Sequence, residues 1–361
     1  MRILIATDAW YPQVNGVVRT LSALAKAIEG FGATIDFVTP EGMPSVGLPS
    51  YPGIRLALPA PYKIARRIKS LRPDAIHIAT EGPIGHTVRW HCRARRRPFT
   101  TSFHTRFADY AVARWPVPEE AIWSWLRWFH NAGRGTMAAT PSLAEELSAR
   151  GFRSVMRWPR GVDSSLFKPR PKKDLGVPGP IFLTVGRLAV EKNLEAFLAL
   201  DLPGSKVVVG EGPAQGELMR RFPDAVFLGH KEGEELASIY ASADVFVFPS
   251  RTDTFGLVLL EALSSGLPVA AIPSPATRDV VGQASPQAPV AALDEDLRAA
   301  CLHALNLSRA ACLEYAKTMT WEASAECFLN NLTQSGVYPS RADFTGGGVS
   351  SEPSQSTARF A

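Results

Sequence analysis

The 361-residue chain lacks several features that would place it in a specialised class. It has no run of 18 or more apolar residues, which argues against a membrane-spanning helix. The apolar start, Met1–Ala6, meets Thr7 and Asp8 at once and is too short and too polar for a signal peptide. Cysteine is scarce and follows no CxxC or zinc-ligand spacing; the four residues are Cys92, Cys301, Cys312 and Cys327. We therefore expect a cytoplasmic protein with reduced thiols.

Acidic residues are sparse in the first half of the chain. Up to Lys173 there are 26 Lys and Arg against 12 Asp and Glu, whereas the remainder holds 13 against 22. This asymmetry suggests that the first half meets an anionic partner, either a nucleic acid or an anionic membrane surface. A solvated basic face without a partner is the third possibility. The glycines that follow strands do not form GxGxxG, which counts against a dehydrogenase.

Short apolar segments alternate with amphipathic ones, which predicts two parallel sheets, each with helices on both faces. The expected strands of the first sheet cover residues 2–6, 34–39, 54–58, 75–80, 99–104 and 136–140. Those of the second cover residues 181–185, 206–209, 225–228, 245–248 and 268–272. We expect a domain at 1–170, a domain at 171–318, a helix at 319–333 and a disordered Gly/Ser-rich tail at 334–361.

The most informative segment is 248–263, where a strand leads through a polar turn into a helix expected to begin near Thr254. The amides of Phe255 and Gly256 would be free donors at a helix N-terminus, which suits an anion. Asp253 and Glu261 are eight residues apart, about 12 Å along a helix. That length is comparable to the distance between the two hydroxyl-rich ends of a nucleotide sugar. In the alternative interpretation, Asp253 is a helix cap and Glu261 an ordinary surface residue.

Two cations follow the first strand of the second sheet. Gly186 ends this strand, and Arg187 and Lys192 come next. A planar guanidinium and an ammonium at a strand's carboxyl end suit a diphosphate. Two solvated surface cations are the alternative.

Three further residues lie at expected strand ends. Gly16 precedes the first helix, where it would permit close approach of a phosphate, and Gly212 lies in a similar loop of the second sheet. His104 ends the strand 99–104 and could hydrogen-bond a sugar hydroxyl or position an acceptor, although a lone histidine is often structural.

Together with Arg160-Gly161-Val162-Asp163 and Thr320-Trp321-Glu322, these segments resemble the retaining GT-B glycosyltransferases. The branch is the one that contains bacterial mannosyltransferases and glucosyl- and sulfoquinovosyl-diacylglycerol synthases. The resemblance covers residues 1–333. It implies an α/β GT-B fold of two Rossmann-like domains across a cleft, with the acceptor in the first and the nucleotide sugar in the second. The 319–333 helix would return to the first domain.

The resemblance also implies a role for each motif residue. The catalytic set would be His104, Arg187, Lys192 and Asp253. The donor-binding set would be Gly16, Gly186, Gly212, Thr254, Phe255, Gly256 and Glu261. The family usually has Glu-x7-Glu, and Asp253 shortens the first carboxylate by one methylene, which bears on the donor sugar.

No enzyme nucleophile is evident, and the family is thought to retain configuration by front-face attack, with the leaving phosphate accepting the acceptor's proton. Neither a cofactor nor a metal is expected. Asp294-Glu295-Asp296 matches a DxD pattern, but it begins a helical stretch, and we interpret it as solvated surface.

The acceptor side should be basic and aromatic. Arg95, Arg96 and Arg97 end an arginine-rich stretch, and Trp123 and Trp125 lie on an amphipathic helix after residue 118. Such a helix fits a membrane interface, with packing in the core as the alternative. We therefore expect a lipid acceptor such as diacylglycerol and a peripheral enzyme on the inner face of the cell membrane.

The expected donors are UDP-glucose or UDP-glucuronate. The alternative is a GDP-mannose-dependent α-mannosyltransferase acting on a lipid or a saccharide. A nucleotide-sugar epimerase of GT-B shape and a nucleic-acid-binding protein are competing classes. The latter is disfavoured because no recognition helix is evident.

Overall fold

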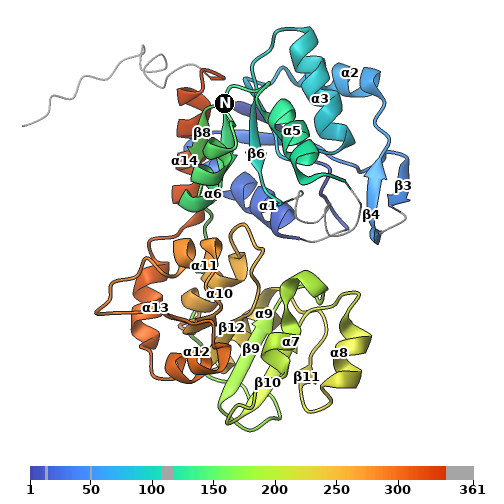
Figure 1. Cartoon of the computed structure of the whole chain (residues 1–361). Coiled ribbons are helices and arrows are strands. Elements are labelled where there is room, and N and C mark those ends of the chain that lie inside the picture. The colour runs from blue at the N-terminus through green and yellow to red at the C-terminus, as the bar shows by residue number, and fades with distance from the viewer. Residues whose placement is uncertain (13–14, 49–50, 107–116, 339–361) are drawn as a thin grey trace, which may run out of the picture.

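The computed structural model describes residues 1–12, 15–48, 51–106 and 117–338. The chain forms two α/β lobes, each built on a six-stranded parallel sheet, and the lobes face each other across a narrow waist (Figure 1). The predicted fold class is confirmed, and its cause is the strict alternation of buried strands with helices. No helix among the described residues is long and apolar enough to cross a bilayer.

The first sheet has the strand order β2-β1-β5-β6-β7-β8. Its strands are β1 (Arg2–Ala6), β2 (Thr34–Val38), β5 (Ala75–Ile78), β6 (Thr100–Phe103), β7 (Thr136–Ala138) and β8 (Val155–Arg157). Its helices are α1 (Gly16–Ile28), α2 (Pro61–Leu71), α3 (Pro83–Ala94), α5 (Glu119–His130) and α6 (Pro141–Ala149). Successive β1 residues enter opposite cores, Ile3 and Ile5 on one face and Leu4 and Ala6 on the other. Both faces are therefore covered, as parallel sheets require.

The second sheet has the order β11-β10-β9-β12-β13-β14. Its strands are β9 (Ile181–Val185), β10 (Ser205–Val209), β11 (Val226–Phe227), β12 (Val245–Phe248), β13 (Val269–Ala271) and β14 (Ala291–Leu293). Its helices are α7 (Leu194–Leu198), α8 (Gln215–Arg221), α9 (Gly233–Ser242), α10 (Leu257–Ser264), α11 (Pro275–Val280), α12 (Leu297–Ala304) and α13 (Arg309–Ala316). Phe182 and Leu183 of β9 again face separate cores.

The strand order reverses direction once in each sheet. The chain runs from β1 outward to β2 and then resumes on the other side of β1 with β5; likewise it runs from β9 to β11 and resumes with β12. Crevices at such reversals, beyond the carboxyl ends of the strands, are where α/β sheets bind ligands. A ligand site is therefore expected at the loops after β1, β5, β9 and β12.

The last helix, α14 (Trp321–Gln334), leaves the second lobe and packs on α1 of the first. Phe328 contacts the rings of Trp158 and His77, with ring centroids 4.9 and 5.1 Å apart. The chain crosses between the lobes at two adjacent places, where Val162 and Thr320 form a β-bridge. Order extends past the expected end of this helix, because Val337 is only 6% exposed. The expected disordered tail therefore cannot start at 334; its remainder, 339–361, lies outside the described residues.

Several expected boundaries are wrong. Residues 54–58 do not join the first sheet: β4 (Tyr51–Ala57) pairs antiparallel with β3 (Ser45–Leu48) in a separate hairpin. The chain also reaches the second lobe before residue 171, since the ring of Phe167 lies 5.6 Å from that of Tyr240 in α9 and its carbonyl accepts from the hydroxyl of Ser264 in α10. The helix expected near Thr254 begins at Leu257 instead.

Candidate active site

The loops at the reversal of the second sheet bring opposite charges together. The ammonium of Lys192, which follows β9, lies 2.6 Å from Oδ1 of Asp253, which follows β12. Asn193 holds the two loops in register because its side-chain amide donates to the carbonyl of Pro249 at 3.1 Å. The sequence analysis placed Lys192 and Asp253 in the same site but did not predict this ion pair. The second oxygen of Asp253, Oδ2, is buried and has no hydrogen-bond partner among the described residues.

The start of α10 is set by backbone geometry. Gly256 caps the helix with φ +84°, in the left-handed region that favours glycine. A Cβ there would also lie 3.1 Å from atoms of Phe248 and Leu259. The helix therefore cannot begin earlier than Leu257. The unpaired backbone amides of its first turn come after Gly256, and not after Thr254 as expected. The amides of Phe255 and Gly256 precede the helix in the same turn.

Thr254 connects the two lobes. Its hydroxyl donates to the carbonyl of His104, at the end of β6, at 2.9 Å. The sequence-predicted histidine of the first domain and the predicted sugar-binding turn of the second therefore meet at one place.

The imidazole of His104 has a defined tautomer. Its Nδ1 lies 3.3 Å from the guanidinium of Arg160, and a guanidinium can only donate. Nδ1 therefore accepts, and the proton of the neutral ring is on Nε2, which is buried without a partner among the described residues. Burial, reinforced by the charge of Arg160, lowers the pKa of His104 well below its usual value. His104 is thus a neutral donor whose N–H meets no acceptor among the described residues.

Arg160 itself is almost fully buried and lies over the ring of Trp158, 4.1 Å from its centroid. It also donates to the carbonyl of Trp158 at 2.6 Å. Burial lowers the pKa of Arg160 to about 9, so the group stays charged at neutral pH. The sequence showed Arg160 only as part of a motif. The signal that could have revealed its role is a cation that directly follows a Trp-Pro pair.

The second carboxylate is buried rather than on a helix surface. Glu261 is 7% exposed and accepts from the hydroxyl of Tyr240 at 2.9 Å and from Arg19 of α1 at 3.1 Å. Burial raises the pKa of Glu261, although Arg19 opposes the shift. The surface interpretation is therefore wrong. Sequence reasoning missed Arg19, which is 242 positions away from Glu261 along the chain.

The predicted glycines differ in what they do. Gly186 has φ +154°, and a Cβ on Gly212 would lie 2.3 Å from the carbonyl of Leu188, so the loops after β9 and β10 pack backbone to backbone. Gly16 begins α1, capped by the side chain of Asn15, and a Cβ there would meet no atom of the described residues within 4 Å. Space for a ligand therefore exists beside Gly16. Its role and that of Arg187, which pairs with Glu191 beside Lys192, stay predictions.

Of the residues predicted to contact a membrane, some are exposed in the structure and others are buried. Arg95 and Arg96 are exposed, and Arg97 is half-buried, with its guanidinium donating to the carbonyl of Pro73. Trp123 is only 1% exposed and contacts the ring of Phe103 and the guanidinium of Arg150, so its assignment to a membrane surface is wrong.

The neighbouring residue Trp125 is half-buried against His86 and does not form an exposed anchor either. The apolar stripe of α5 packs on the sheet, which was the alternative interpretation. A hydrophobic stripe alone does not tell which surface covers it.

No group of three metal-ligating side chains occurs within the described residues. In the DxD-like segment, Asp296 caps α12 and Glu295 pairs with Arg251 at 2.6 Å on the surface. The surface interpretation of this segment is confirmed, whereas metal independence stays a prediction.

Known proteins share this architecture. Family models described as Glycosyltransferase Family 4 and Glycosyl transferases group 1 match residues 14–166 and 179–306. A GDP-mannose-dependent alpha-mannosyltransferase of Mycolicibacterium smegmatis is 32% identical over 308 residues, covering 78% of this chain and 82% of that protein. An alpha-monoglucosyldiacylglycerol synthase of Streptococcus pneumoniae is 27% identical, covering 78% and 73%. The solved sucrose-phosphate synthase of Thermosynechococcus elongatus superposes with a TM-score of 0.70 at 19% identity, covering 92% and 98%.

Proposed function

The chain belongs to the retaining GT-B glycosyltransferases that include the Mycolicibacterium smegmatis mannosyltransferase, and we propose that it transfers a hexose from a nucleotide diphosphate sugar to a membrane lipid. One observation carries this proposal. A buried donor, His104 Nε2, and a buried acceptor, Asp253 Oδ2, both lack partners among the described residues at the junction of the lobes. A polyhydroxylated ligand can satisfy both at once, because each hydroxyl donates and accepts.

The chemistry of the proposed reaction needs charge stabilisation more than a nucleophile. The acceptor oxygen attacks the anomeric carbon, the bond from that carbon to the diphosphate oxygen breaks on the same face, and the departing diphosphate takes the acceptor's proton. In this proposal Lys192 and the first amides of α10 stabilise the charge that develops on the diphosphate; the ion pair of Lys192 with Asp253 and the start of α10 at Leu257 support it. Arg187 supplies a second cation after the same strand, and Glu261 holds the ribose. No metal ion takes part, so turnover should survive chelation by EDTA.

Support for the donor is divided. The sequence favoured UDP-glucose or UDP-glucuronate, whereas the Mycolicibacterium smegmatis relative uses GDP-mannose by its name. We place GDP-mannose first because that relative exceeds 30% identity over more than three quarters of this chain. The acceptor proposal, a lipid such as diacylglycerol at the inner face of the membrane, draws support from the name of the Streptococcus pneumoniae relative.

Melting curves with each of the three donors test the proposal, because a bound ligand raises the melting temperature by mass action. We expect a rise with one donor and none in Lys192→Ala, whose ammonium is part of the site. Turnover is then measured with that donor and diacylglycerol in mixed vesicles. An absence of any shift, or consumption of the donor without an acceptor as in an epimerase, contradicts the proposal.

A further inference from the structure

An arginine of the first lobe reaches the carboxylate that the proposed function assigns to the ribose. Arg19 lies on α1, and its Nη1 donates to Oε1 of Glu261 on α10 at 3.1 Å. The other carboxylate oxygen, Oε2, accepts from the hydroxyl of Tyr240 on α9 at 2.9 Å. Glu261 is therefore held by Tyr240 from its own lobe and by Arg19 from the opposite lobe.

The two members of this ion pair differ in burial. The side chain of Glu261 is 9% exposed, whereas that of Arg19 is 31% exposed. A carboxylate at this depth needs a counter-charge, because burial favours its neutral form. Burial is the main cause that raises the pKa of Glu261, and the charge of Arg19 opposes this shift. Arg19 therefore helps to keep Glu261 ionised, and it can do so only while the two lobes are together.

Glu261 keeps the capacity to accept hydrogen bonds from a diol. An ionised carboxylate has about four lone-pair sites, shared between its two oxygens. Among the described residues each oxygen of Glu261 accepts one hydrogen bond, so each can accept another. The vicinal hydroxyls of a ribose match this arrangement, because each can donate to one oxygen. A protonated carboxyl would replace one of these acceptors by a donor, so the ionised state that Arg19 favours is the one that binds the diol.

Arg19 shares a face of α1 with a residue already predicted to meet the donor. Gly16 and Arg19 are three positions apart, so they are neighbours on one side of the helix. A Cβ on Gly16 would meet no atom of the described residues within 4 Å, which leaves space for a ligand on that side. Arg19 thus lies one turn along α1 from the glycine predicted to face the diphosphate, which places its guanidinium toward the ribose end of the donor.

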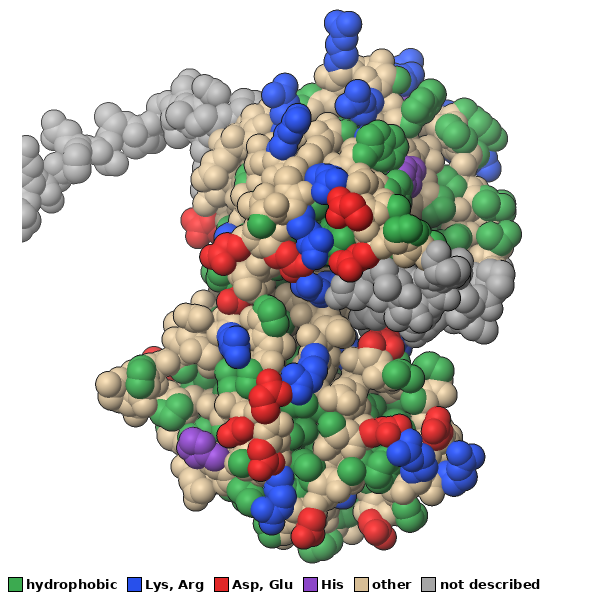
Figure 2. Space-filling model, in the orientation of Figure 1, with side chains coloured by type: hydrophobic (Ala, Val, Ile, Leu, Met, Phe, Trp, Pro, Cys, Tyr) green, Lys and Arg blue, Asp and Glu red, His purple; other side chains and the backbone are tan. Residues whose placement is uncertain are grey.

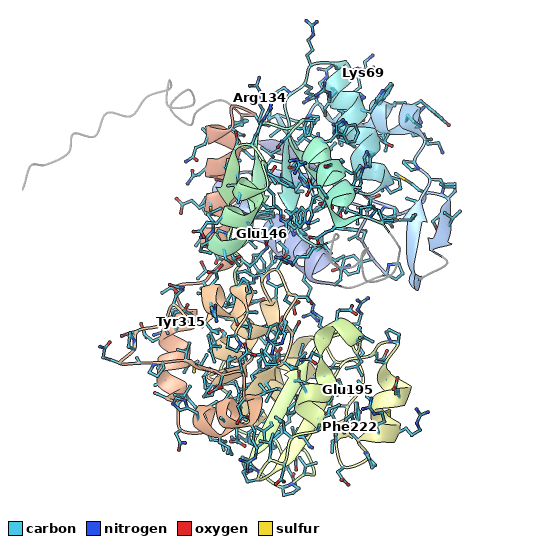
Figure 3. The ribbon with its side chains drawn as sticks, viewed as in Figure 1. Lys69, Arg134, Glu146, Glu195, Phe222 and Tyr315 are labelled. Atoms are coloured by element: carbon cyan, nitrogen blue, oxygen red, sulfur yellow. The ribbon has the colours of Figure 1, made fainter. Side chains whose placement is uncertain are left out.

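A second contact between the lobes offers a comparison. Ser142, at the start of α6, donates from its backbone amide and its hydroxyl to Oδ2 of Asp279 on α11, at 2.8 and 2.6 Å. Figure 2 shows acidic and basic side chains on both margins of the junction. Figure 3 shows Glu146 of α6 near the junction, whereas Arg134 lies at the remote end of the first lobe. Of these two contacts, the one made by Arg19 is the one that involves a predicted donor-binding residue.

We propose that Arg19 is a positioning residue for the donor nucleotide: by pairing with Glu261 across the junction, it fixes the carboxylate that accepts the two ribose hydroxyls. Tight binding of the ribose then requires closed lobes, so donor binding and lobe closure are coupled. The inference rests on the proposed function, which assigns Glu261 to the ribose. It adds a charged residue of the first lobe to the ribose end of the site.

Titration calorimetry of the full chain with GDP and UDP, and with their 2′,3′-dideoxy forms, tests this role. The dideoxy forms lack the hydroxyls that Glu261 would accept. Arg19→Met should raise the Kd of the preferred nucleotide about tenfold, as expected for a hydrogen bond to a charged group, and leave the Kd of its dideoxy form within about twofold. Arg19→Lys keeps the charge and should recover most of the loss. In turnover, the KM for the donor should rise in Arg19→Met more than kcat falls.

Asp279→Ala is the matched control, because it removes a contact between the lobes without touching Glu261. It should weaken the binding of the ribose and dideoxy forms by the same factor. Should Arg19→Met fail to fold by circular dichroism, Arg19→Gln, which removes the charge but keeps a polar side chain, serves for the same comparison.

Two outcomes would overturn the role of Arg19 and leave the proposed function standing. Equal losses for the ribose and dideoxy forms in Arg19→Met would make Arg19 a contact between the lobes only, like Asp279. An unchanged Kd for the ribose form would mean that the nucleotide binds without help from Arg19. A chain that binds neither GDP nor UDP is a different result, because it refutes the proposed function together with this inference.

Discussion

The contact between Arg160 and His104 leads to the sharpest prediction. Arg160→Met keeps an apolar side chain of similar length over Trp158 but removes the donor that faces Nδ1 of His104. Without that donor, both tautomers of the imidazole become accessible, and His104 no longer presents only an N–H on Nε2. A hydrogen bond with a charged partner contributes about 1.5–3 kcal/mol. Because this one is 3.3 Å long, the lower figure applies, and kcat/KM should fall about tenfold.

A pH profile separates this positioning role from a merely structural one. Burial is the main cause that lowers the pKa of His104, and the charge of Arg160 is the second. Removing the charge raises the pKa while burial still holds it below 6.5, so the acid limb of kcat/KM should move to higher pH. Arg160→Lys keeps the charge and should leave the limb in place. The tautomer itself is read from the imidazole ¹⁵N shifts.

The reasoning is refuted if Arg160→Met shows the same tautomer and the same acid limb as the unmodified chain while kcat/KM stays within twofold. A fall in kcat/KM that merely follows a lower melting temperature would assign Arg160 to stability alone.

Three other predictions concern turnover and stability. Lys192→Ala and Glu261→Ala should each reduce turnover at least about 100-fold, because each removes a charge from the site, with the circular dichroism spectrum unchanged; full activity in either contradicts the site. His77 is buried with its pKa lowered to about 3, so the stability it contributes is present above about 6.5, its unfolded value, and is lost as pH falls. Urea unfolding should therefore show roughly 2 kcal/mol less stability at pH 5 than at pH 7 from this residue, a difference absent in His77→Gln. Phe328→Ala should cost about 3–5 kcal/mol in the same assay, since Phe328 fills the contact of α14 with Trp158; a loss below about 1 kcal/mol would mean that α14 is not needed by the first lobe.

Much of the fold could be predicted because buried parallel strands are continuous apolar runs. β1, β9 and β12 have the expected bounds for that reason. β8 and β14 were missed because each has only three residues and lies at a sheet edge, where most of its side chains are partly exposed. The expected start of α10 was wrong because only the positive φ of Gly256, invisible in a pattern of side chains, delays the helix.

The site was predictable where a motif carries its own chemistry. Lys192 and Asp253 meet because both follow strands at the reversal of one sheet, which strand order alone anticipates. Arg19 and Arg160 contact residues that are far away in the sequence, Glu261 and His104, and no local spacing predicts such contacts. Trp123 was assigned wrongly because an amphipathic helix has the same pattern whether a sheet or a membrane covers its apolar face.

The bridge between Val162 and Thr320 has a consequence for the construction of the molecule. Both ends of the described chain lie in the first lobe, so the second lobe is an insertion within it rather than a successor to it. The backbone atoms of Thr320 and Trp321 lie where a Cβ of Gly161 would be, so the outgoing and incoming segments touch without a gap. Two adjacent crossing segments allow the lobes to hinge about one axis but resist rotation of one lobe against the other. The lobes should therefore open by tilting about that axis. Deletion of the inserted second lobe should leave the first lobe intact.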